Sequence, residues 1–69
     1  MNLLTVWGDP TNRSSYTIDL FPMSDRFSQR AVRQVLVYAR DYPEAMDIAR
    51  REAVRLELEP RSGNLERLN

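Results

Sequence analysis

The fold is decided by the stretch VLVYARDYPEAMDIARREA, residues 35–53, in which the spacing of the apolar residues changes halfway along. Residues 35–39 form a nearly unbroken apolar run rich in β-branched and aromatic side chains, which is typical of a strand. After Pro43 the apolar residues return every three or four positions, which is the period of an α-helix. The stretch therefore predicts a strand that leads directly into a helix.

The helix is expected over about residues 42–58. Asp41 stands at the N-cap and Glu44 follows three residues later, the spacing at which each side chain binds a free amide at the helix start. Pro43 falls in the first turn, where its missing N–H is not needed. Residues 54–59, VRLELE, also alternate, so they either end the helix or form a fourth strand. One helix face is flat enough to approach a sheet closely, and it carries Ala45, Ile48, Ala49, Ala53 and Leu56.

Three strands are expected before the helix, over about residues 2–7, 14–21 and 31–39, because apolar and polar residues alternate or β-branched residues cluster there. The segment GDPTNR between the first two strands is rich in turn residues and predicts a hairpin. For residues 24–40 a helix capped by Ser24 is the alternative, and it would give a ββαα order. That helix would carry Phe27, Ala31, Val35 and Tyr38 at helical spacing.

The predicted architecture is α+β, with a three-stranded antiparallel β-meander packed on one C-terminal helix in the order βββα. It forms a single compact domain over residues 1–59, and residues 60–69 are expected to be a polar, flexible tail. The alanine face of the helix is expected to form the core with Leu4, Val6, Ile18, Leu20, Val35 and Val37. One helix covers only one side of a sheet. The other side is therefore expected to stay uncovered, and it carries Leu3, Trp7, Phe21, Leu36 and Tyr38.

Composition argues against several function classes. The chain has neither cysteine nor histidine, which removes disulfides, the usual zinc ligands and most pairs of a nucleophile with a base. We therefore expect no enzyme, no metal, no cofactor and no small-molecule substrate. Ten basic and ten acidic residues give zero net charge, so no strong field attracts nucleic acid or an anionic membrane. Without a signal-peptide pattern or a run of about 18 apolar residues, we expect a cytoplasmic protein.

An uncovered sheet face with aromatic residues is typical of a contact surface, and a short chain gains stability by association. We therefore expect a non-enzymatic protein-interaction module that is homodimeric through this face. The expected contact residues are Leu3, Trp7, Phe21, Leu36 and Tyr38, with Arg33 and Arg40 at the rim.

Two further partners follow from other features of the chain. Its size, single-domain build and lack of catalytic groups resemble those of phage and mobile-element accessory or inhibitor proteins. This resemblance implies that a host protein is a further partner. The alternative function is regulation or binding of single-stranded nucleic acid, in which the same aromatic rings and arginines would contact bases and phosphates.

Overall fold

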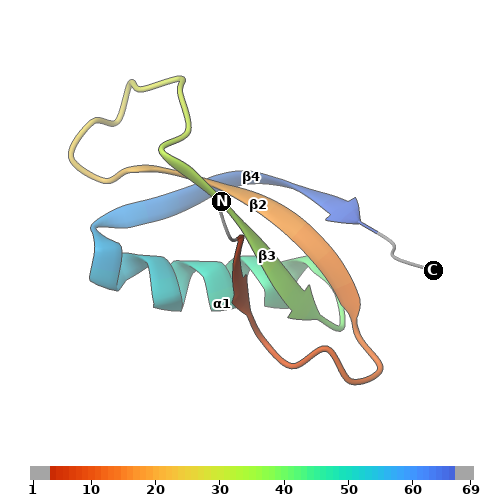
Figure 1. Ribbon diagram of the computed structural model, residues 1–69. Helices are drawn as coiled ribbons and strands as arrows, with labels where there is room; N and C mark the ends of the chain where they lie inside the picture. The colour runs from red at the N-terminus through yellow and green to blue at the C-terminus, as the bar shows by residue number, and fades with distance from the viewer. Residues whose placement is uncertain (1–3, 67–69) are drawn as a thin grey trace.

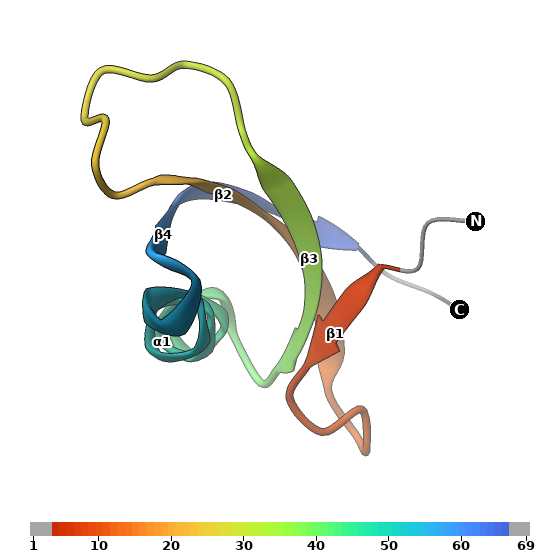
Figure 2. The same ribbon diagram turned by 60° about the vertical axis from the view of Figure 1, so that its left-hand side comes forward.

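The computed structural model describes the backbone of residues 4–66 and the side chains of residues 4–61. It is an α+β fold in which a four-stranded mixed sheet packs on one helix (Figure 1). The helix lies on the concave side of the curved sheet (Figure 2). The elements in chain order are β1 (Thr5–Trp7), β2 (Ser14–Pro22), β3 (Arg33–Ala39), α1 (Tyr42–Ala53), a 3₁₀ turn (Val54–Leu56) and β4 (Leu58–Glu66).

The strand order in the sheet is β1-β3-β2-β4. β2 is antiparallel to both β3 and β4, whereas β1 pairs with β3 in parallel. The expected strand over residues 31–39 is confirmed by β3, so the ββαα alternative is wrong. The expected antiparallel meander is also wrong, because β1 and β2 are not neighbours and form no hairpin.

The connection between β1 and β2 has to pass the end of β3. It spans two strand spacings, about 9.5 Å, which residues 8–13 can reach and a two-residue hairpin turn cannot. Gly8 has a φ of 87°, in the left-handed region, and a Cβ atom at this position would overlap the carbonyl oxygen of Tyr38. A glycine is therefore required where the chain leaves β1 and crosses β3.

β4 is the main addition to the expected fold. The fourth strand that was the alternative for residues 54–59 forms over residues 58–66, so it includes most of the segment expected to be a polar tail. It has nine residues and pairs with β2. Glu57 has a φ of 58° and reverses the chain after the 3₁₀ turn, so that Leu58 and Pro60 become buried. Proline is tolerated here because β4 lies at the sheet edge and the register with β2 shifts nearby, between Asp19 and Leu20.

The helix begins as expected and ends earlier. Asp41 is the N-cap, and its Oδ1 accepts a 2.9 Å hydrogen bond from the Glu44 amide. The expected end near residue 58 is wrong, since α1 stops at Ala53. The predicted helix face is confirmed for Ala45, Ala49 and Ala53, which are fully buried against the sheet. It is wrong for Leu56, which lies in the 3₁₀ turn and is 42% exposed.

The core lies between α1 and the concave side of the sheet. Besides the three alanines it contains Tyr16, Ile18, Leu20, Val35, Val37, Ala39 and Leu58. The expected burial of Leu4 and Val6 is wrong, since these side chains are 46% and 50% exposed. Parallel pairing sets Trp7 opposite Val37, so Trp7 packs against the core instead. A shift of one residue exchanges the two faces of a strand, so each residue of β1 lies on the face opposite to the one that the sequence predicts.

Candidate functional site

The convex side of the sheet is the candidate contact surface. No segment within residues 4–66 crosses it (Figure 2). We call this surface the open face and define it by the described side chains, other than the buried Ser15, that the strand register places opposite the helix: Val6, Thr17, Asp19, Phe21, Gln34, Leu36 and Tyr38. The sequence predicted that this surface is uncovered. From the first strand it predicted Leu3 and Trp7 there, whereas the structure places Val6 of β1 on it.

The centre of the open face is apolar and one end is polar. Leu36 is flanked by Val6 on β1 and by Thr17 on β2, at directly paired positions. Toward the other end, Gln34 donates a 2.9 Å hydrogen bond from Nε2 to the Asp19 carboxylate. Interfaces that form and dissociate are about as apolar as the rest of a protein surface. A mixture of apolar and polar residues is therefore compatible with both exposure to water and contact with a partner protein.

Arg61, a residue that the sequence did not single out, closes one end of the open face. Its guanidinium lies 4.8 Å from the centre of the Phe21 ring, within the range of a cation–π contact. The same group forms a 3.3 Å ion pair with Glu59, its neighbour on β4. Because Arg61 covers part of the Phe21 ring, Phe21 offers less apolar surface to a partner than the sequence predicted. The sequence did not predict these contacts of Arg61, because residues 60–69 were expected to lie outside the sheet.

The structure divides the predicted contact residues between three places. Phe21, Leu36 and Tyr38 lie on the open face as expected. The face predicted for Trp7 is wrong, and Trp7 lines a pocket of about 220 Å³ with Arg33 on the helix side of the sheet. The other residues lining this pocket are Thr5, Glu52, Arg55 and Leu56. Leu3 lies outside the described residues.

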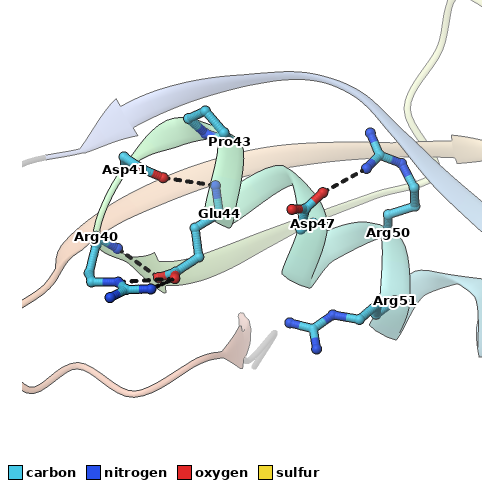
Figure 3. Close-up of a pocket in the computed structure, with 7 residues that line it drawn as sticks. All are labelled: Arg40, Asp41, Pro43, Glu44, Asp47, Arg50 and Arg51. Carbon is cyan, nitrogen blue, oxygen red and sulfur yellow. Dashed lines mark hydrogen bonds and ion pairs between the residues drawn. The ribbon is translucent and has the colours of Figure 1, made fainter.

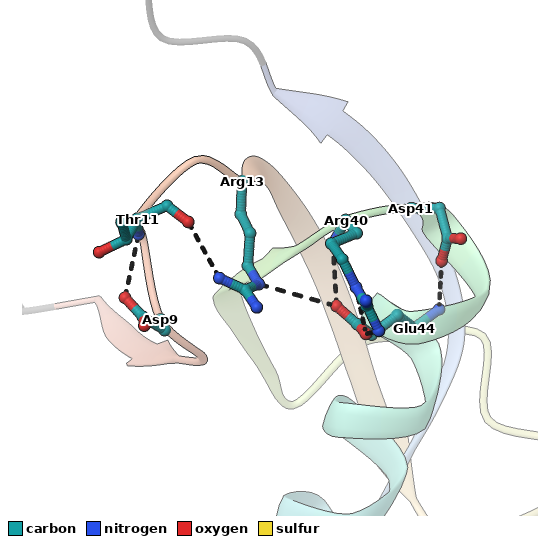
Figure 4. Close-up of polar contacts among 6 residues, drawn as sticks. All are labelled: Asp9, Thr11, Arg13, Arg40, Asp41 and Glu44. Atoms are coloured by element: carbon teal, nitrogen blue, oxygen red, sulfur yellow. Dashed lines mark hydrogen bonds and ion pairs between the residues drawn. The ribbon is translucent and has the colours of Figure 1, made fainter.

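Arg40 belongs to a polar network at the start of α1 and not to the open face (Figure 4). Its Nη2 and Nε donate to Oε2 of Glu44 at 2.7 and 3.1 Å, and its amide donates to Oε1 at 2.9 Å. In the expected capping box, the Glu44 side chain would accept the amide of the N-cap residue, Asp41. It accepts the amide of Arg40 instead, one residue earlier in the chain. Arg13 adds a 4.0 Å ion pair from the β1–β2 connection. This network fixes that connection to the helix.

Hydrogen bonds and ion pairs in this network lower the pKa values of Glu44 and Asp9 and raise the pKa of Arg40. The side-chain hydrogen bonds from Arg40, followed by its amide, lower the pKa of Glu44. The same contact raises the pKa of Arg40. The pKa of Asp9 is lowered chiefly by the amide of Thr11, which donates to its Oδ1 at 3.0 Å. These shifts follow from local hydrogen bonds that hold a turn and a helix end in place.

A pocket of about 550 Å³ lies beside the same helix end (Figure 3). Its lining residues are Arg40, Asp41, Pro43, Glu44, Asp47, Arg50 and Arg51. The carboxylates are already engaged, since Glu44 binds Arg40 and Asp47 binds Nη1 of Arg50 at 3.0 Å. Among the described residues, no group of three or more acidic side chains is arranged to hold a metal ion. Apart from Arg51, the charged side chains of the pocket are therefore engaged with one another or with the backbone, and the pocket carries no chemistry.

Within residues 4–66, no helix is both long and apolar enough to cross a membrane. Comparison with protein-family models, with curated proteins and with solved structures found no match to this chain.

Proposed function

We propose that this chain is a non-enzymatic protein-interaction module that binds a partner protein through the open face. The observation that carries the proposal is the position of Leu36, which lies between Val6 and Thr17 on a sheet face that no described segment covers. An apolar centre with a polar end is suited to a contact that forms and dissociates. A protein of a host cell, as expected of a phage or mobile-element accessory protein, is the partner we place first.

A homodimer through the open face is the second form of this proposal. The hydrogen-bonded pair of Asp19 and Gln34 makes the face more polar than the interface of a permanent homodimer, which resembles a protein core. For this reason we place the homodimer after a separate protein. Binding of single-stranded nucleic acid stays a prediction, and the arginines expected to serve it gain no support. Arg40 is paired with Glu44, and Arg33 lies on the helix side of the sheet.

The test uses two substitutions on the open face and one control away from it. Val6→Asp and Leu36→Asp each place a charge in the centre of the face, while Arg51→Asp makes an equally drastic change on the exposed side of α1. The immobilised chain is exposed to extract of its source cells, and the retained protein is identified, purified and bound again to each variant. We expect both face variants to weaken binding at least about tenfold and the control to leave it unchanged.

Circular dichroism of each variant shows whether the fold is retained, and only folded variants are compared. Full binding by both folded face variants would contradict the proposal. In parallel, a labelled single-stranded oligonucleotide at low salt tests the nucleic-acid alternative, which requires binding that weakens steeply as salt is added.

A further inference from the structure

The longest connection of the fold, residues 23–32 between β2 and β3, projects beyond the end of the sheet (Figure 1). It is held in a defined shape by its own hydrogen bonds. The carboxylate of Asp25 accepts the amide of Phe27 at 3.1 Å, and the carbonyl of Asp25 accepts the amide of Ser28 at 3.3 Å. At the C-terminal end of the loop, the amide of Val32 donates a 2.8 Å hydrogen bond to the carbonyl oxygen of Leu20.

A side chain from β4 reinforces this shape. The guanidinium of Arg61 donates to the carbonyl oxygens of Ser28, Asp25 and Pro22 at 2.7, 2.9 and 3.2 Å. Hydrogen bonds from a charged donor are about twice as strong as neutral ones. The loop is therefore pre-organised by a residue far from it in sequence, and pre-organisation reduces the entropy lost when a loop binds.

The loop presents an aromatic ring directly to solvent. Phe27 is 90% exposed, the highest value among the large apolar residues of the described chain. Its neighbours Arg26 and Arg30 are also exposed and form no ion pair within the described part of the chain. Such a ring in water lacks the stabilisation that burial of its apolar surface would give. A rigid loop with an exposed ring and free positive charges has the composition of a binding anchor.

The same end of the molecule carries a pocket that complements this anchor. It has a volume of about 390 Å³ and is lined by Met23, Ser24, Val54 and Glu57. Met23 and Val54 are 45% and 54% exposed, so the pocket offers uncovered apolar surface. Glu57 adds a carboxylate at its rim, opposite in charge to Arg26. The bond between the Phe27 amide and Asp25, together with the Arg61 contacts, holds the loop in the shape that leaves the ring outside.

We propose that a second copy of this chain occupies the pocket, with the Phe27 ring of each copy inserted between Met23 and Val54 of the other. The guanidinium of Arg26 then meets the carboxylate of Glu57 across the interface. Because each copy carries both the ring and the pocket, one two-fold axis makes every contact twice and closes the pair. The dimer forms at the end of the sheet, and this inference is independent of the function proposed for the open face.

The first test measures molar mass by analytical ultracentrifugation of the purified chain, from about 1 µM to about 1 mM, a range that covers weak interfaces. We expect a monomer–dimer equilibrium. Phe27→Ser should weaken it at least about tenfold without changing the circular dichroism spectrum, because the ring contributes little to the folded monomer. Val32→Ser is the matched control, since Val32 is 61% exposed at the end of the same loop, and it should leave the dimer unchanged.

The second test exchanges the charges. Arg26→Glu and Glu57→Arg should each weaken the dimer, and the chain carrying both substitutions should recover most of the lost affinity. A monomer at every concentration would overturn the proposal, as would a dimer that is insensitive to Phe27→Ser. A dimer that is dissociated by Leu36→Asp and not by Phe27→Ser would assign self-association to the open face instead.

Discussion

Replacing Trp7 by alanine is expected to destabilise the domain far more than the same change at its neighbour Val6. The Trp7 ring is partly buried and packs against the core beneath β1. Truncation of a core tryptophan to alanine costs about 3–5 kcal/mol, and we expect about 2–3 kcal/mol here because part of the ring is exposed. Val6 is 50% exposed, so Val6→Ala should remove about 0.8 kcal/mol, half the value of two fully buried methylene groups.

The difference is large relative to the stability of so small a domain. A chain of 69 residues is expected to have a free energy of unfolding of about 3–10 kcal/mol. Since about 1 kcal/mol shifts Tm by about 4–8 °C at this size, Trp7→Ala should lower Tm by roughly 8–24 °C. Far-UV circular dichroism during heating and in urea measures this for both variants, and it remains usable after the chain's single tryptophan has been removed.

The result also tests the parallel pairing of β1 with β3. If β1 were turned by one residue, Val6 would face the core and Trp7 would lie on the open face. Val6→Ala would then be the more destabilising change. Equal effects, or the reverse order, would refute the register in which Trp7 lies opposite Val37.

Two further substitutions test the connection between β1 and β2 and the start of α1. Gly8→Ala should destabilise the domain by about 2 kcal/mol or more, because its Cβ would overlap the Tyr38 carbonyl and its φ is positive; an unchanged urea midpoint would contradict that close approach. Glu44 has a lowered pKa, so its contribution to stability is complete above its ordinary value of 4.5 and is lost as pH falls through the lower folded value. The difference in Tm between the native chain and Glu44→Gln should therefore be constant near neutral pH and decrease below pH 4.5; a difference that does not change with pH would exclude the ion pair with Arg40 as its source.

Local sequence patterns were sufficient to predict those elements whose position and buried face depend only on their own residues. The alternation of apolar and polar residues around Ile18 and Leu20 predicted β2 and the face that it buries. The cap at Asp41 and the alanine face predicted where α1 begins and which side it turns to the sheet. In each case neighbouring residues in the sequence carry the whole signal, so one chain is enough to detect it.

The remaining features depend on contacts between distant residues. Nothing in the run containing Val6 and Trp7 indicates that its partner is β3, and the choice of partner decides which of the two is buried. A fourth strand was only an alternative, over residues 54–59, because Pro60 and Gly63 weaken the strand signal beyond that point, although an edge position tolerates both. The role of Arg61 was missed for the same reason, since its partners in the β2–β3 loop become neighbours only once β4 has paired.

The order of the strands also affects the chain while it is being synthesised. β2 is made early, yet one of its two sides is completed only by residues 58–66, which leave the ribosome after the helix. At about 5–20 residues per second, this leaves the backbone of β2 without its second neighbour for a few seconds. During that interval a nascent chain is exposed to mispairing with other chains.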